Sequence, residues 1–179
     1  MSETLRQPAE TKITIVQGEY KISARSDVVL STLLGSCVAM CLFDPIARMG
    51  GLNHFLLPGG DAGDESDRSL RYGAYSMELL VNSLLAQGAA KARLRAKLFG
   101  GARMLAGLTD LGARNADFAE QYVQRENIPL VGGSLRGDRG RRVEFWPCTG
   151  RTRQLLLGGA LAPERYVPPP RDSGSVELF

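Results

Sequence analysis

Cys37 and His54 are the two residues of this chain whose side chains best suit nucleophilic chemistry. The sequence holds three cysteines and one histidine. Cys37 follows a Gly-Ser pair, and glycine at that point allows a sharp turn and keeps side-chain bulk away from the thiol. An imidazole beside a thiol can take its proton and leave a nucleophilic thiolate. Chemistry that needs both groups must therefore use His54.

A β-hairpin predicted around Asp44 would bring the two residues together. The apolar runs 38–43 and 52–57 are rich in strand-forming residues and flank the segment 44–47, where Asp followed by Pro favours a type I turn. A turn that closes between Asp44 and Ala47 would place Cys37 opposite His54, with about 4.5–5.5 Å between the Cβ atoms. A bulged turn would shift the register by about one residue. From geometry alone, a nucleophile with its base and a buried structural pair both remain open.

The sequence gives less support for a catalytic or metal-binding role of the other cysteines and of Thr32. Cys41 shares a strand face with Cys37 but lies deeper in the apolar run, and Cys148 lies in a turn, so we expect both to be structural. A zinc site is disfavoured because Cys-x3-Cys along one strand separates the sulfurs by roughly 13 Å. We therefore expect no metal. Thr32 could orient the imidazole through its hydroxyl, although from the residues alone a space-filling role at a strand edge is the simpler interpretation.

Strands and helices are interspersed along the predicted chain, which favours an α/β or α+β sandwich with a mixed sheet. The helix 69–87 is expected to bury Leu70, Ala74, Met77, Val81 and Leu84 and to end at Gly88. A second helix, 115–127, is expected to begin with Asn115 as its N-cap. Outside the hairpin, the expected strands are 12–17, 28–30, 94–99, 143–146 and 151–157, with a hairpin-like arrangement after residue 130.

Length and composition indicate one domain with two tails. The chain has 179 residues, of which 44% are hydrophobic, and a net charge of +3. We expect a domain over residues 12–161, a flexible tail over 1–11 and a proline-rich, disordered tail over 162–179. The dispersed arginines give little support to nucleic-acid binding. No apolar run approaches the roughly 18 residues of a membrane span, so we expect a cytoplasmic protein with free thiols.

The glycine-rich and charged segments are best explained as loops, turns and solvated surface. The segment 59–67 is expected to be a mobile loop beside His54, and the terminal segment 176–179 is a very unspecific candidate for a docking peptide. No glycine cluster has the spacing of a phosphate-binding loop, so turns explain them better. The clusters are 100–102, 132–133 and 137–140, and the arginines expected on a solvated face are Arg136, Arg139, Arg141 and Arg142.

The segment LLGSCVAMCLFDPIARMGGLNHFLLP resembles the signature of the CheD family, the chemoreceptor glutamine deamidases of bacterial chemotaxis. Further blocks resemble the family in the same order and extend the resemblance over roughly residues 12–157. They are RYG at 71–73, KLFGGARM at 97–104, GARN at 112–115 and IPLVGGSLRGDRGRRVEFWPCTG at 128–150.

The resemblance implies a three-layer α/β sandwich around a mixed sheet, similar to the deamidase domain of cytotoxic necrotising factors. It implies Cys37 as nucleophile, His54 as base and Thr32 as the third member of the site. The turn at Gly35 and Ser36 is then expected to supply backbone support for the oxyanion. The implied activity is hydrolysis of receptor glutamines to glutamate, for which no metal and no organic cofactor is expected.

The resemblance also leaves other functions open. The implied partners are methyl-accepting chemotaxis receptors and a CheC-type phosphatase. One alternative is an adaptor that binds receptor or phosphatase with little turnover. Another is a cysteine-dependent methylesterase or peptidase, which would use the same thiol and imidazole on a different carbonyl group.

Overall fold

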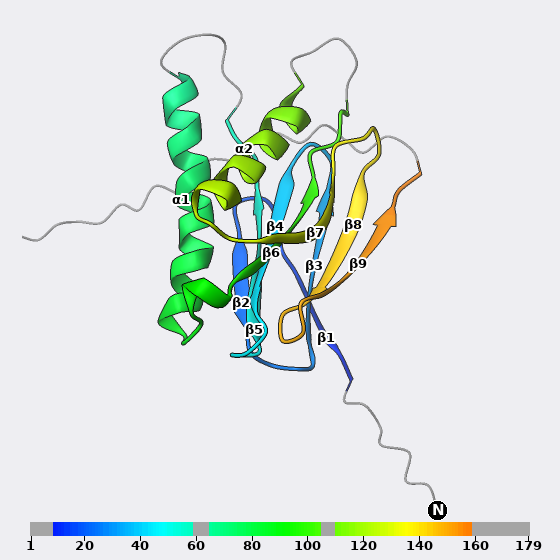
Figure 1. Ribbon diagram of the computed structural model, residues 1–179. Helices are drawn as coiled ribbons and strands as arrows, with labels where there is room; N and C mark the ends of the chain where they lie inside the picture. The colour runs from blue at the N-terminus through cyan, green and yellow to red at the C-terminus, as the bar shows by residue number, and fades with distance from the viewer. Residues whose placement is uncertain (1–8, 59–64, 105–109, 159–179) are drawn as a thin grey trace, which may run out of the picture.

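Two β-sheets and two α-helices make up the described part of the chain, residues 9–58, 65–104 and 110–158 of a computed structural model (Figure 1). The helices are α1 (Glu65–Ala86) and α2 (Leu111–Arg125), with a short 3-10 turn at Lys91–Arg93. The strands are β1 (Thr11–Thr14), β2 (Tyr20–Ser23), β3 (Val28–Leu34), β4 (Val38–Asp44), β5 (Met49–Phe55), β6 (Arg95–Gly100), β7 (Leu130–Leu135), β8 (Arg141–Trp146) and β9 (Arg151–Leu156). None of the described helices has the length and apolar character needed to cross a membrane.

Both sheets are mixed. One sheet has the strand order β1-β3-β8-β9, and the other has the order β2-β5-β4-β6-β7. The pairs β1–β3 and β6–β7 are parallel, whereas all the other pairs are antiparallel. The predicted α/β class with mixed pairing is confirmed, and the pairing is divided between two sheets. Strand β7 belongs to the five-stranded sheet and β8 to the other, so the hairpin-like arrangement expected after residue 130 holds only for β8 and β9.

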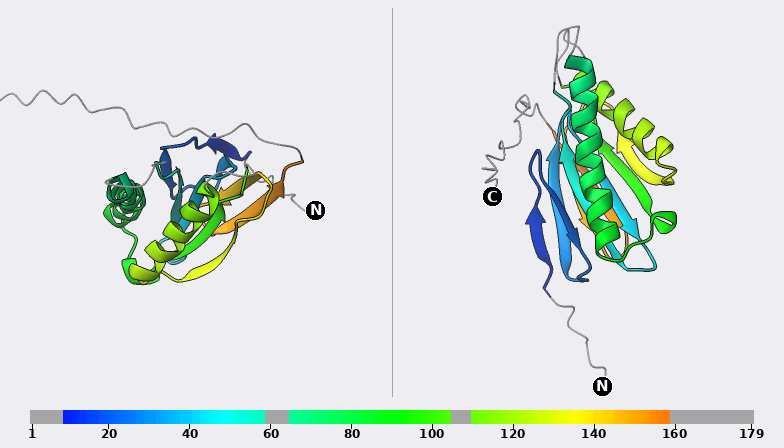
Figure 2. Two further views of the ribbon diagram at one scale, coloured as in Figure 1. Left: turned by 90° about the horizontal axis from the view of Figure 1, so that it is seen from above. Right: turned by 90° about the vertical axis from the view of Figure 1, so that its left-hand side faces the viewer.

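The three layers follow from the way β4 is buried. Its side chains Val38, Met40 and Leu42 join a core with α1 and α2, while Ala39 and Cys41 join a second core with the four-stranded sheet. A strand that is covered on both faces consists of a nearly continuous run of apolar residues, as the sequence of β4 does. The order of the layers is thus helices, five-stranded sheet and four-stranded sheet (Figures 1 and 2), and the implied three-layer sandwich is confirmed.

The hairpin around Asp44 exists, but its predicted register is wrong by two residues. Asp44 pairs with Met49, and His54 lies opposite Ala39 rather than opposite Cys37. The loop is longer than expected, and its last residue, Arg48, adopts a left-handed conformation with a φ of 53°. Since side chains alternate with a period of two, a shift of two residues keeps every side chain on its predicted face.

The second helix begins earlier than the sequence pattern predicts. Its N-cap is Asp110, whose Oδ1 accepts a hydrogen bond from the Ala113 N–H at 2.9 Å. Asn115 is therefore not the cap but a buried residue inside α2. Phe118 and Tyr122, further along α2, are also buried.

The first helix matches its prediction better. It extends from residue 65 to residue 86, and Gly88 follows it with a φ of 105°, consistent with the predicted C-terminal cap. Met77, Val81 and Leu84 are buried, but Leu70, also predicted to face inward, is exposed. Residues 59–64 of the loop expected beside His54 lie outside the described residues, and residues 65–67 belong to α1.

Two interpretations of charged and glycine-rich segments were wrong. Gly132 and Gly133 lie within β7 rather than in a turn. Arg141 is buried instead of solvated, because its guanidinium donates hydrogen bonds to the carbonyl oxygens of Ser134 and Arg136. Residues 1–8 and 159–179, which include most of both predicted tails and the terminal segment 176–179, lie outside the described residues.

Candidate functional site

The candidate site lies where the chain crosses from one sheet to the other. Strand β3 belongs to the four-stranded sheet and β4 to the five-stranded sheet, so the link Gly35–Ser36–Cys37 joins the two layers. Cys37 is fully buried and contributes to the core between the sheets. The predicted nucleophile therefore occupies the boundary between two layers rather than the middle of a hairpin.

Thr32 and His54 meet across this boundary. Thr32 lies on the same face of β3 as the core residues Leu30 and Leu34 and is 1% exposed. His54, on β5 of the other sheet, is 5% exposed. The distance from Thr32 Oγ1 to His54 Nδ1 is 2.9 Å. The structure thus brings together two of the three residues that the resemblance implied.

The hydrogen bonds of Thr32 determine which nitrogen of His54 carries the proton. A threonine hydroxyl has a single proton, and that of Thr32 is donated to the carbonyl oxygen of Ile15 at 2.7 Å. Toward His54 the hydroxyl oxygen must therefore accept, which requires a proton on Nδ1. In the neutral imidazole Nε2 then has the lone pair, so Nε2 is the basic nitrogen.

The connection between β1 and β2 holds both residues in place. Its Ile15 carbonyl accepts the Thr32 hydroxyl proton, and its Ile15 N–H donates to the Ser31 carbonyl at 2.8 Å. The His54 backbone donates to Glu19 at 3.0 Å and accepts from Gly18 at 2.8 Å. Sequence reasoning missed this segment because it contributes backbone groups, which any residue type would supply.

Cys37 and His54 lie on the same face of the five-stranded sheet. His54 is directly opposite Ala39, and Cys37 precedes Ala39 by two positions, so both side chains point into the space between the sheets. Cross-strand residues offset in this way are diagonal neighbours, with Cα atoms about 7–8 Å apart and Cβ atoms somewhat closer. The pair is therefore diagonal, whereas the sequence predicted a direct opposition.

Three consecutive carbonyl groups of the Gly35–Ser36–Cys37 turn accept hydrogen bonds. The donors are Ala102 N–H to Gly35 at 2.9 Å, Asn115 Nδ2 to Ser36 at 2.9 Å and Gly101 N–H to Cys37 at 2.8 Å. In a trans peptide the C=O and the following N–H point in opposite directions, and the described chain contains no cis peptide bond. The N–H groups of Ser36 and Cys37 therefore point away from the groups that bind the carbonyls, as an oxyanion-binding turn requires.

The remaining cysteines have surroundings that suit structural roles. Burial raises the pKa of the Cys41 thiol far above its ordinary value, and Lys97 lowers it only partly. Burial also raises the pKa of Cys148, with a smaller opposing effect from Arg48. No group of three or more His, Cys, Asp or Glu side chains that could hold a metal ion occurs within residues 9–58, 65–104 and 110–158.

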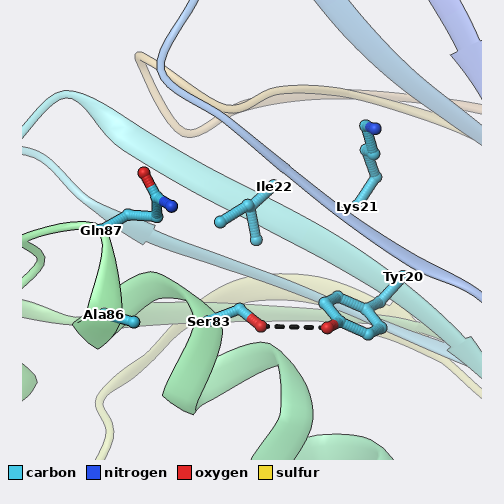
Figure 3. A pocket seen from close by; sticks show the side chains of 6 residues that line it. All are labelled: Tyr20, Lys21, Ile22, Ser83, Ala86 and Gln87. Carbon is cyan, nitrogen blue, oxygen red and sulfur yellow. Dashed lines mark hydrogen bonds between the residues drawn. The ribbon is translucent and has the colours of Figure 1, made fainter.

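A hollow of about 400 Å³ between β2 and α1 lies apart from these residues (Figure 3). It is lined by Tyr20, Lys21, Ile22, Ser83, Ala86 and Gln87. The Tyr20 and Ser83 hydroxyls bond to each other at 3.1 Å. Its lining includes no cysteine, histidine or carboxylate, so the boundary between the sheets remains the candidate site.

Comparison with known proteins identifies the family. The model of the family CheD, described as CheD chemotactic sensory transduction, matches residues 56–154. A relative from Acidiphilium cryptum is 54% identical over 178 residues, covering 94% of this chain and 93% of its own. The chain belongs to the CheD family. The region matched by the family model begins after Thr32, Cys37 and His54, so that match does not depend on the candidate site.

Other CheD relatives are similarly close. One from Caulobacter vibrioides is 49% identical, covering 94% of this chain and 93% of its own. One from Agrobacterium fabrum is 48% identical, covering 98% of this chain and all of its own. All three carry the name "Probable chemoreceptor glutamine deamidase CheD". Among solved structures, the hypothetical protein YfiH of Bacillus licheniformis aligns with a TM-score of 0.43 and 16% identity over 64% of this CheD-family chain and 49% of its own, a distance at which nothing about the site carries over.

Proposed function

We propose that this protein is a chemoreceptor glutamine deamidase in which Cys37, His54 and Thr32 form the catalytic site. The observation that carries the proposal is the Thr32–His54 hydrogen bond, because it leaves Nε2 as the basic nitrogen on the sheet face that Cys37 shares. The names of the relatives agree with this chemistry.

In the first half of the reaction, His54 Nε2 takes the Cys37 thiol proton and the thiolate attacks the side-chain amide carbon of a receptor glutamine. The amide oxygen becomes an oxyanion, which the N–H groups of Ser36 and Cys37 stabilise. The imidazolium then protonates the leaving nitrogen, the C–N bond breaks and ammonia departs. A thioester between Cys37 and the substrate remains.

In the second half, neutral His54 takes a proton from water, which attacks the thioester carbon. The C–S bond breaks, the imidazolium returns its proton to the Cys37 sulfur, and glutamate is released. The balance is glutamine and water to glutamate and ammonium, because the released ammonia takes the proton that the new carboxyl group loses. Thr32 keeps Nδ1 protonated throughout, so the imidazole exchanges protons through one nitrogen only.

The proposed substrates are methyl-accepting chemotaxis receptors, where each conversion adds one negative charge. A CheC-type phosphatase is the proposed second partner. The support for receptors is the printed name of the relatives. The phosphatase follows only from the sequence resemblance to the family.

The test is intact-mass spectrometry of a purified receptor cytoplasmic fragment incubated with this protein, followed by peptide mapping. We expect glutamine-to-glutamate conversion that is lost in Cys37→Ala and in His54→Ala. Cys148→Ala serves as the matched control, since its buried thiol lies in the turn after β8, and the Pro147 carbonyl of that turn is close to Gly50 near the start of β5, four residues before His54. Conversion that persists in folded Cys37→Ala would contradict the proposal. Binding without conversion would favour an adaptor, and loss of methyl groups from methylated receptor would favour a methylesterase.

A further inference from the structure

Asn115 is a buried side chain that the proposed reaction does not yet use. It lies inside α2 and is 1% exposed. Its Oδ1 accepts the Leu57 N–H at 2.9 Å, and its Nδ2 donates to the Ser36 carbonyl at 2.9 Å. One side-chain amide thereby links the residue before Cys37 to the segment that leaves β5 after His54.

The bond to Ser36 determines the direction of a backbone N–H group. The Ser36 carbonyl and the Cys37 N–H belong to one planar trans peptide and point in opposite directions. Holding the Ser36 oxygen against Asn115 therefore directs the Cys37 N–H toward the opposite side, where the proposed oxyanion forms. Rotation of this peptide plane would misdirect the donor.

The start of α2 keeps Asn115 itself in place. A Cβ on Gly112 would come within 2.2 Å of the Ala102 carbonyl oxygen, so the helix backbone packs directly on the segment after β6. Arg114 donates to the Pro58 carbonyl at 3.0 Å and to Ser69 Oγ at 2.8 Å. The Asn115 amide is thus preorganised by contacts on both sides.

We propose that Asn115 is a positioning residue for the deamidation, which acts by orienting the Ser36–Cys37 peptide so that the Cys37 N–H can stabilise the oxyanion. This inference deepens the proposed function and rests on it. An amide suits the position because it must accept from Leu57 and donate to Ser36 at once. An ionised carboxylate could accept from Leu57 but would place an acceptor against the Ser36 oxygen.

The first test compares Asn115→Ala with Asn53→Ala. Asn53 is also fully buried, but its Oδ1 accepts from the Met40 N–H at 2.9 Å and its Nδ2 lies 3.3 Å from the Met77 sulfur, on the helix side of the sheet. Both variants should lower the urea midpoint. Only Asn115→Ala should lower kcat, by about tenfold to a hundredfold with KM nearly unchanged, because a misplaced donor acts on the transition state. Equal kcat values in the two variants would overturn the proposal.

Asn115→Asp supplies a conservative variant that keeps the shape of the side chain and the bond from Leu57. Its kcat relative to the original protein should rise as the pH falls, because a protonated carboxyl regains a donor for the Ser36 oxygen. A ratio that does not change with pH would contradict the role of the donor. If Asn115→Ala does not fold, Asn115→Asp can be used to test the proposal in its place.

Alkylation of Cys37 by iodoacetamide, followed by peptide mapping across a range of pH, provides a readout that needs no receptor. The profile of Asn115→Ala should move to higher pH, because rotation of the Ser36–Cys37 peptide also displaces the Cys37 thiol from its base His54. The profile of Asn53→Ala should coincide with that of the original protein. An unchanged Asn115→Ala profile would overturn the positioning role. If the original protein does not deamidate the receptor fragment, the proposed function fails, and the alkylation profiles still decide whether Asn115 orients the Ser36–Cys37 peptide.

Discussion

Thr32 Oγ1 lies 2.9 Å from His54 Nδ1, and the two residues belong to different sheets. Because the Thr32 proton is donated to the Ile15 carbonyl, this contact fixes the imidazole tautomer as well as its orientation. The base proposed for Cys37 therefore depends on contacts that exist only when the layers are packed together.

Replacing Thr32 by valine tests this dependence. Thr32→Val leaves the buried Nδ1–H without its acceptor at a cost of about 1–3 kcal/mol. The proposed deamidation should slow about tenfold to a hundredfold, because each tenfold corresponds to about 1.4 kcal/mol. Thr32→Ser retains the hydroxyl and is the matched control. Initial rates by mass spectrometry measure the effect, and a Thr32→Val rate equal to that of Thr32→Ser would disprove the role of the hydroxyl.

Gly100 offers a test of the turn that holds Cys37. Its φ is 107°, and a Cβ there would lie 2.1 Å from the Cys37 carbonyl oxygen. Gly88 has nearly the same φ, 105°, but a Cβ added there would have no atom within 4 Å, so Gly88→Ala measures backbone strain alone. We expect Gly88→Ala to cost about 1–3 kcal/mol and to keep activity. Gly100→Ala should be less stable and inactive when folded, as measured by urea unfolding and deamidation rates; equal effects would contradict this account.

The environment of Asp44 predicts that the folded protein becomes less stable in acid. Burial would raise the pKa of this fully buried carboxyl, but hydrogen bonds from Arg93 and from the backbone of Ala47, Ala90 and Ile46 together hold the pKa well below its usual range. A lowered folded-state pKa stabilises the protein above the unfolded-state pKa of about 3.9, and this contribution disappears as the pH falls toward the folded-state value.

Urea unfolding of Asp44→Asn at several pH values checks this linkage. At pH 7 the variant should be less stable by about 1.5–3 kcal/mol, because it loses charge-assisted hydrogen bonds. Below the unfolded-state pKa of about 4 the difference should shrink. Asp27, whose ion-pair partner Arg25 is exposed, serves as a control whose substitution by Asn has little effect. A difference that stays constant from pH 7 to pH 2 would show that Asp44 does not titrate as argued.

Cys41 and Cys148 should remain unreactive in the folded protein. Burial raises the pKa of both thiols, so little thiolate forms at neutral pH. Cys148→Ala should keep the deamidation rate, and Cys41→Ala should do the same with a stability loss of about 1 kcal/mol for the small cavity. Alkylation mapping at pH 7 should modify Cys37 first, because Cys37 is equally buried but has His54 to take its thiol proton. Prior modification of Cys148 would count against this assignment.

The fold class could be predicted because the signals for strands, helices and turns lie within short stretches of the sequence. The run at β4, the helix ended by Gly88 and the strand ended by Gly100 all appear where expected. The register of the β4–β5 hairpin could not be predicted, because the longer loop and the left-handed conformation of its last residue, Arg48, have no distinctive sequence signal.

Long-range contacts account for the errors at the site. Asn115 resembles an N-cap because asparagine is a preferred cap residue, whereas its bonds to Ser36 and Leu57 join segments distant in the chain. Arg141 looked solvated because no pattern in its own strand indicates that the carbonyl oxygens of Ser134 in β7 and of Arg136 accept hydrogen bonds from its guanidinium. The spacing of two residues between Leu30, Thr32 and Leu34 could have indicated that Thr32 shares the core-facing side of β3 with the two leucines.

The crossing of the chain between the two sheets links the chemistry to the completion of folding. Neither sheet alone contains both Thr32 and His54, and Cys37 lies on the link between them. In a chain still emerging from the ribosome, or one damaged so that the layers separate, Thr32 no longer fixes the tautomer of His54, so the thiol lacks a correctly protonated base and is a poor catalyst on other proteins. For an enzyme whose product is a permanent change in another protein, this structural arrangement is itself a safeguard.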